Sequence, residues 1–159
     1  MEQRKLLSLS VLVVRAGSIS PTLLLFLAAS GVGRIAVVDH DNLEVYDLHW
    51  QVIHTEGRRG TSKARSACDD MRTLNPNALV TAVMEPLTGY NNMEIVRVND
   101  CVVDTIDNPR TGYLINNACD LAERYLKTAA MTNGVGGRGG GPMPLVSGSG
   151  MVTEGGIMV

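Results

Sequence analysis

The stretch Ser10 to Asp41, SVLVVRAGSISPTLLLFLAASGVGRIAVVDHD, decides the fold. Val11 to Val14 is a short unbroken apolar run, which predicts a parallel strand buried on both faces. Thr22 to Ser30 is apolar and has the length of a crossover helix, and Gly31 is typical of a residue that ends one. Arg34 to Val38 is a second β-branched run. The order strand, helix, strand predicts a βαβ unit with parallel strands.

The turn after the first strand reads RAGSIS and occupies the place of a phosphate-binding turn. A G-x-G-x-x-G turn uses its glycines for positive φ and for close approach to phosphate. Here the three glycine positions fall on Arg15, Gly17 and Ser20, so only the middle glycine is present. Asp39 and Asp41 follow the second strand, where an acid of a Rossmann-like unit holds a ribose hydroxyl. This pattern alone leaves two interpretations open: a nucleotide site, or a βαβ unit with an ordinary polar turn.

Composition narrows the class of protein. The chain has 159 residues, 45% of them hydrophobic and 19% charged, which is typical of one globular domain. A formal net charge of -2 gives no basic field for nucleic acid, and no apolar run approaches the ~20 residues of a membrane span. Cys68, Cys101 and Cys119 are widely spaced, which predicts reduced thiols, a cytoplasmic location and no structural zinc site. We therefore expect neither a nucleic-acid nor a membrane partner.

The rest of the chain continues the alternation of helices and strands. Periodicity predicts a helix over Ala64 to Leu74, a strand over Leu79 to Val83, a short helix over Asn92 to Val98, a strand over Cys101 to Asp104 and a long helix over Pro109 to Lys127. On the long helix we expect the inward-facing residues to be Tyr113, Leu114, Ala118, Leu121 and Ala122. On the helix over Ala64 to Leu74 we expect one stripe of Ala64, Ala67, Cys68, Met71 and Leu74.

The C-terminal part differs in composition. Thr128 to Met143 is rich in glycine, which predicts a flexible inserted loop. A strand is expected over Pro144 to Ser147, and another begins at Gly155. The predicted fold class is therefore α/β: a Rossmann-like, mostly parallel sheet flanked by helices and incomplete at its C-terminal end.

Two charged residues at element boundaries allow more than one interpretation. Lys63 opens a helix behind an expected N-cap at Thr61 or Ser62, where the helix dipole disfavours a cation unless an anion lies nearby. It is either such an anion-binding residue or a solvated lysine. Asp107 follows a strand's carboxyl end, where it could hold a metal-phosphate complex or cap the next helix.

Four motifs in combination carry a resemblance to a known family. They are VVDHD, GTSKA, VVDTIDN and PLVSGS. Together they resemble the ThiF/MoeB-type adenylating domain, which is related to ubiquitin-activating enzymes. The frame is most similar to eukaryotic enzymes that activate ubiquitin-fold sulfur carriers for molybdenum cofactor biosynthesis and tRNA thiolation. The resemblance covers nearly the whole chain outside the glycine-rich stretch, so we expect residues 1–159 to form one nucleotide-binding adenylation domain.

The resemblance implies a function and a set of site residues. Such a domain binds ATP with Mg²⁺ and adenylates the carrier's C-terminal glycine. It implies a ribose acid at Asp39, a catalytic phosphate lysine at Lys63 and a catalytic, magnesium-linked acid at Asp107. The full implied nucleotide-binding set is Gly17, Ser18, Asp39, Asp41, Gln51, Lys63, Asp107 and Asn108. The implied partners are a ubiquitin-fold sulfur-carrier protein and a second subunit, either an identical chain or a full-length relative.

Several positions depart from the family's pattern. Ser18 replaces the glycine nearest the nucleotide, and Arg15 replaces the first turn glycine, where positive φ costs about 1–2 kcal/mol. Asp47 replaces an asparagine, Trp50 replaces a phosphate-facing arginine, and Gly112 takes the place of another arginine. Losing two arginines while adding a carboxylate removes on the order of 5 kcal/mol of phosphate stabilisation.

These departures keep two alternatives open beside a competent adenylating domain. The first is a catalytically impaired relative or fragment that binds a carrier protein or a full-length partner. The second is a plain dinucleotide-binding module, against which Lys63 and the Asp107-Asn108 pair argue.

Overall fold

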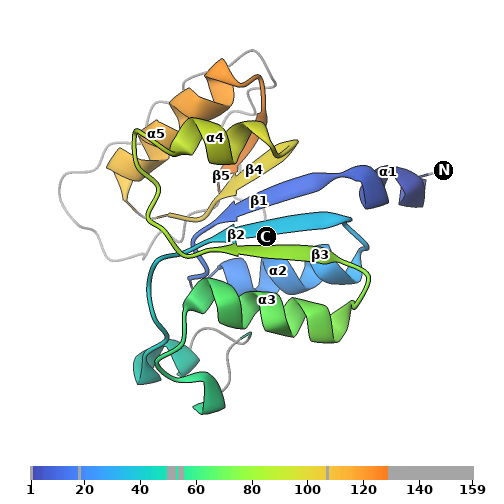
Figure 1. The fold of residues 1–159 in the computed structure, drawn as a ribbon, viewed down its shortest axis with the longest axis vertical. Coiled ribbons are helices and arrows are strands. Elements are labelled where there is room, and N and C mark those ends of the chain that lie inside the picture. Colours follow the sequence, from blue (N-terminus) through green and yellow to red (C-terminus); the bar gives the residue numbers. More distant parts are fainter. Residues whose placement is uncertain (1, 18, 50–52, 54–55, 107, 129–159) are drawn as a thin grey trace, which may run out of the picture.

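One parallel sheet organises the part of the chain that the structure describes (Figure 1). The computed structural model describes residues 2–17, 19–49, 53, 56–106 and 108–128. The strands are β1 (Ser10–Val14), β2 (Arg34–Val38), β3 (Leu79–Val83), β4 (Cys101–Asp104) and β5 (Tyr125–Thr128). Their order is β3-β2-β1-β4-β5, and every neighbouring pair is parallel. The predicted α/β, Rossmann-like fold class is confirmed for this part of the chain.

β1 lies at the centre because both of its edges are paired. Val11 is in register with Ile35 of β2 on one side and with Cys101 of β4 on the other. All five residues of β1 are buried, and Leu12 and Val13 have no exposed surface. A strand covered on both faces needs apolar side chains in both directions, which is why its sequence is an unbroken apolar run.

Helices cover both faces of the sheet. α2 (Ser20–Ala29) and α3 (Lys63–Leu74) lie on one face, and α4 (Asn92–Arg97) and α5 (Pro109–Leu121) lie on the other (Figure 1). Two clusters of buried side chains result, one that includes Leu24 and Met71 and another that includes Leu12 and Ile115. Two 3-10 helices, η1 (Val45–His49) and η2 (Glu56–Arg58), lie between β2 and α3.

A short N-terminal helix, α1 (Glu2–Ser8), was not expected from the sequence. It packs against the residues that connect α2 to β2. Gly31 has φ +82°, as expected for the residue that ends a helix, and Gly33 donates its backbone N–H to the carbonyl of Leu6 at 3.0 Å. A Cβ atom at Gly33 would lie 1.8 Å from the carbonyl oxygen of Leu7, so this contact requires glycine.

The expectation of one long helix over Pro109 to Lys127 is wrong. α5 ends at Leu121, the chain turns through Glu123 at φ 52°, and β5 then pairs with the open edge of β4. The hydrogen bonds of that edge outweigh a local pattern that suits a helix equally well.

Some of the side chains expected to face inward are also exposed. Tyr113 is 45% exposed, Leu121 75% and Leu74 50%. The prediction is confirmed for Ala118, which forms the buried face of α5 together with Ile115 and Cys119. The predicted stripe on α3 is otherwise confirmed, since Ala64, Ala67, Cys68 and Met71 are buried.

The C-terminal expectations largely concern residues that the structure does not describe. Thr128 is the last residue of β5 rather than the first of a loop. The rest of the glycine-rich stretch, the strand expected over Pro144 to Ser147 and the strand expected from Gly155 lie outside the described residues. They stay predictions.

Candidate functional site

The site lies at the carboxyl ends of the strands, where the chain changes direction along the sheet. From β1 the chain builds outward through β2 to β3, and it then returns to place β4 on the other side of β1. A cavity of about 270 Å³, which we call the cleft, opens at this edge. Its apolar walls include Val14, Val38, Pro86, Leu87 and Ile106, and its polar lining includes Arg15, Asp39, Asp41 and Asn108. Open α/β sheets bind their ligands at such switch points.

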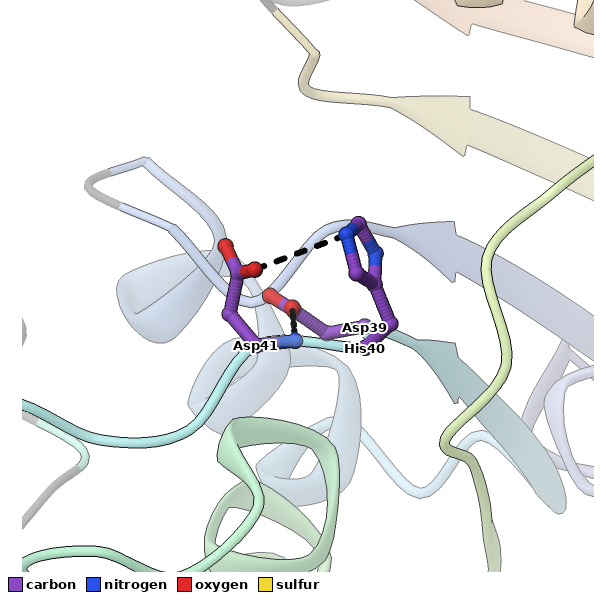
Figure 2. A group of neighbouring side chains, drawn as sticks. All are labelled: Asp39, His40 and Asp41. Atoms are coloured by element: carbon purple, nitrogen blue, oxygen red, sulfur yellow. Dashed lines mark hydrogen bonds and ion pairs between the residues drawn. The ribbon is translucent and has the colours of Figure 1, made fainter.

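Asp39 is the most buried polar residue among the described residues that line the cleft. It follows β2 and is only 4% exposed. Its Oδ2 accepts the backbone N–H of Ala16 at 2.8 Å, and its Oδ1 accepts that of Asp41 at 2.8 Å (Figure 2). The carboxylate thus ties the turn after β1 to the end of β2. Each oxygen keeps a second acceptor position, so Asp39 can also accept a ligand hydroxyl.

Two exposed neighbours of Asp39 extend the polar lining. Figure 2 shows His40 and Asp41 on the same side of the chain, with 3.5 Å between His40 Nε2 and Asp41 Oδ1. Single ligand atoms of Asp39, His40 and Asp41 lie within 4.8 Å of one another, close enough to contact one cation. The sequence reasoning missed His40, although its place beside Asp39 in VVDHD was the available signal.

The turn after β1 adopts the strained conformation expected from its pattern. Arg15 has φ 77°, in the region that favours glycine. Its N–H donates to Val38 O at 2.7 Å, and its carbonyl accepts the Thr105 hydroxyl at 3.1 Å, so both neighbouring strands hold the turn. A Cβ atom at Gly17 would lie 3.1 Å from Arg15 Nε. Gly17 therefore leaves room for the arginine side chain that lines the cleft.

Lys63 lies beside the cleft but does not line it. Its N–H donates to Asp41 O at 3.0 Å, which places the start of α3 against the cleft edge. Its Nζ forms an ion pair with Asp47 Oδ1 at 3.0 Å, and the two residues are 7% and 5% exposed. Asp47 also accepts the N–H of Glu44 through Oδ2 at 2.8 Å. The alternative of a solvated lysine is therefore wrong: the anion that compensates Lys63 belongs to the chain itself.

The helix caps near the site are clear. Ser62 caps α3 by accepting the N–H of Arg65, as expected. Asn108 caps α5 by accepting the N–H of Arg110 at 3.1 Å, whereas Asp107, for which a capping role was one alternative, lies outside the described residues. Asn108 both caps α5 and lines the cleft.

Asp104 is a buried acid that the sequence reasoning did not select. It ends β4, is 3% exposed and accepts the N–H of Ile106 at 2.9 Å. Burial raises the pKa of its carboxyl, and the backbone hydrogen bond only partly offsets this. A Cβ atom at Gly112 would lie 3.4 Å from its Oδ2.

The three cysteines are not activated as nucleophiles. Burial raises the pKa of Cys68 to about 11 and that of Cys119 to about 12, and it also raises the pKa of Cys101. A reactive cysteine needs a lowered pKa, because the thiolate is the nucleophile.

The structure brings part of the predicted set together. Asp39, Asp41 and Asn108 line one cleft, Gly17 leaves room for the Arg15 side chain there, and Lys63 donates its backbone N–H to the Asp41 carbonyl at the cleft edge. Ser18, Gln51 and Asp107 lie outside the described residues, as does Trp50.

Comparisons with known proteins agree with this geometry. The family model described as ThiF family matches residues 1–159. The chain belongs to the ThiF family. A ThiF-family relative, the adenylyltransferase and sulfurtransferase MOCS3-1 of Zea mays, is 43% identical over 128 residues, which are 80% of this chain and 27% of the relative. The MOCS3 protein of Culex quinquefasciatus is 38% identical over 157 residues, which are 99% of this chain and 32% of the relative.

A solved structure shares the fold. It is the Escherichia coli tRNA N6-threonylcarbamoyladenosine dehydratase TcdA in complex with ATP, with a TM-score of 0.76 and 25% identity. The match covers 79% of this chain and 52% of that one. This ThiF-family chain thus spans about a third or less of the two curated relatives and about half of the solved structure. Within its described residues, no helix is both long and apolar enough to cross a bilayer.

Proposed function

We propose that this chain is a nucleotide-binding adenylation domain that uses ATP to activate the C-terminal glycine of a ubiquitin-fold sulfur-carrier protein. One observation carries the proposal: in a ThiF-family chain, the cleft at the switch point of the sheet is lined by the buried, oriented carboxylate of Asp39. The named relatives that are adenylyltransferases support it. So does the ATP bound to the solved structure that shares this fold.

The cleft suits the nucleoside part of ATP. Asp39 would accept ribose hydroxyls, because its two backbone N–H donors fix the carboxylate and leave acceptor positions open. Pro86, Leu87 and Ile106 offer an apolar surface to the adenine ring. Small-molecule sites commonly combine such apolar walls with a few placed polar groups.

Positive groups near the cleft would act on the phosphates. Adenylation joins the carrier's carboxylate to the α-phosphate and releases pyrophosphate, so cations must stabilise the charge that develops. Arg15 lines the cleft, and Lys63 lies at the N-terminus of α3, where the helix dipole also favours an anion. We assign Lys63 and Asp107 the catalytic roles, with Asn108, Gly17, Ser18, Asp41 and Gln51 as further nucleotide-binding residues.

Magnesium fits the donor set of the site. The carboxylates of Asp39 and Asp41 are hard oxygen donors of the kind that Mg²⁺ prefers, and Asp107 is the ligand that we propose. Bound Mg²⁺ would neutralise phosphate charge. The described cysteines would take no part in the chemistry, because burial raises the pKa of each.

A second candidate function rests on the Lys63–Asp47 ion pair. Since Lys63 is already neutralised within the chain, phosphate binding competes with an internal carboxylate. The chain could then be an impaired relative that binds a carrier protein, an identical chain or a longer relative without turnover. In either case, we propose that residues 1–159 form one ThiF-type nucleotide-binding adenylation domain.

ATP–pyrophosphate exchange with a ubiquitin-fold carrier ending in Gly-Gly tests the proposal. We expect label to enter ATP only when chain, carrier and Mg²⁺ are all present. A carrier that lacks the last glycine is the matched control and should abolish exchange. Carrier binding without exchange would instead support the impaired relative, and neither binding nor exchange would contradict both candidates.

A further inference from the structure

Asp47 supplies the anion that pairs with Lys63 in this structure. Its Oδ1 lies 3.0 Å from Lys63 Nζ, and both residues are more than nine-tenths buried. The second oxygen is held by the N–H of Glu44, so the carboxylate is fixed rather than swinging in solvent. Lys63 is therefore engaged by an anion of the chain before any ligand arrives.

The charge that remains in the cleft does not favour phosphate. Its described lining contains the carboxylates of Asp39 and Asp41 against the single guanidinium of Arg15. Lys63 does not line it. With the Lys63 charge neutralised, a polyphosphate without Mg²⁺ would meet a described lining that is negative on balance, whereas an uncharged nucleoside would meet no Coulombic repulsion.

The size of the cleft points the same way. A volume of about 270 Å³ lies just below the range of about 300–1,000 Å³ for small-molecule sites. Its apolar walls suit a base, and the oriented Asp39 carboxylate suits the hydroxyls of a sugar. Of the two cations assigned to the phosphates, Arg15 lines the cleft, but Lys63 points to Asp47.

We propose that Asp47 is a specificity-determining residue that makes this cleft a nucleoside site, so that adenosine, AMP and ATP bind with similar affinity until the Lys63–Asp47 pair opens. The inference rests on the proposed nucleotide site. The Lys63 side chain has a flexible four-carbon stem, so it can turn to a phosphate once its carboxylate partner is removed. ATP recognition is then limited by an ion pair and not by the shape of the nucleoside pocket.

The unmodified chain provides the first test, because it needs no variant. Isothermal titration with adenosine, AMP and ATP, all without Mg²⁺, should give dissociation constants within about threefold of one another. An ATP affinity that exceeds that of adenosine by more than this factor would overturn the inference, while leaving the proposed function intact.

The variant Asp47→Asn provides the second test. An asparagine oxygen can still accept the N–H of Glu44, but the anion on Lys63 is gone. A charge-assisted hydrogen bond to phosphate predicts a gain of about tenfold or more for ATP and AMP, with adenosine unchanged. Asp69→Asn on α3 removes the same charge from an exposed carboxylate that pairs with Arg72, and it should change none of the three affinities.

The outcomes separate the two proposals. An equal gain for all three ligands, or no gain for ATP in a folded Asp47→Asn chain, would overturn the role of Asp47. Circular dichroism and a thermal melt establish folding, because removing one member of a buried ion pair is destabilising. If neither chain binds any of the three ligands, the proposed nucleotide site fails and the inference fails with it.

Discussion

At the scale of single residues, several groups at the cleft also hold the local backbone in place. Asp39 joins the turn after β1 to the end of β2, and Asn108 caps α5 while it lines the cleft. Arg15 holds a strained turn in place through its own backbone. Ligand binding and local stability are therefore coupled at these positions, so variants need controls that separate the two effects.

The turn at Arg15 gives a direct prediction about strain. Because its φ is 77°, a residue with a Cβ atom costs about 1–2 kcal/mol there, and glycine avoids most of this. Arg15→Gly should therefore be more stable than Arg15→Ala by about 1 kcal/mol, since both variants lack the guanidinium. Chemical denaturation checks this. Equal stability of the two variants would mean that the turn is not strained in solution.

A second residue-scale prediction concerns the opposite edge of the sheet. Asp100 Oδ2 accepts both the N–H and the hydroxyl of Ser10, at 2.8 and 2.7 Å. These hydrogen bonds from Ser10 hold the pKa of Asp100 below its ordinary value. A carboxyl whose pKa is lower in the folded state stabilises the fold above its unfolded pKa, and this stabilisation is lost as pH falls through the folded pKa.

Asp100→Asn should therefore destabilise the chain by about 1 kcal/mol at pH 7, because neutral acceptors form weaker hydrogen bonds than charged ones. The difference from the unmodified chain should shrink as the pH falls below about 4, the unfolded value for aspartate. Urea melts across this pH range give the measurement. A difference that stays constant with pH would contradict the assigned role of the charge.

At the scale of elements, the close packing of α1 against the start of β2 depends on one glycine. A Cβ atom at Gly33 would lie 1.8 Å from the Leu7 carbonyl oxygen, so backbone must move to admit it. Gly33→Ala should destabilise the chain by about 1–3 kcal/mol, as overpacking does. Gly57→Ala is the matched control, because nothing lies within 4 Å of its added Cβ, and it should stay within about 0.5 kcal/mol. Thermal melts of both variants decide the point.

The βαβ unit and the segment Pro109 to Lys127 show which helices and strands the sequence could predict and which it could not. The βαβ unit was predictable because a doubly buried strand and a crossover helix both need continuous apolar sequence. The split of Pro109 to Lys127 into α5 and β5 was not, because Tyr125–Thr128 becomes a strand only through hydrogen bonds to β4. Local periodicity carries no information about a partner strand that lies far along the chain.

The candidate site divides in the same way. Asp39, Asp41 and Asn108 were predictable as neighbours because each follows a parallel strand, and such strands end at one edge of the sheet. The Lys63–Asp47 pair was not, because Asp47 lies in η1 of the connection between β2 and α3, whose path no periodicity defines. That pair is the feature that most changes the expected chemistry.

At the scale of the whole molecule, the sheet order places one cleft where β1 and β4 diverge into different connections. Helices cover both faces of the sheet, and the connections that follow β1, β2 and β4 lie at this edge (Figure 1). ThiF-family membership and the cleft together support the proposal that a nucleotide binds at this edge. The charge of the described lining supports weak binding of its phosphates.

A titration of the ¹⁵N-labelled chain with adenosine, followed by amide chemical shifts, tests this central claim most directly. We predict saturable shifts at Ala16, Gly17, Asp39, His40, Asp41, Leu87 and Thr111, with the amides of α1 and the amino ends of the strands unchanged. Saturable shifts confined to another face of the sheet, or no saturable shift at millimolar adenosine, would contradict it.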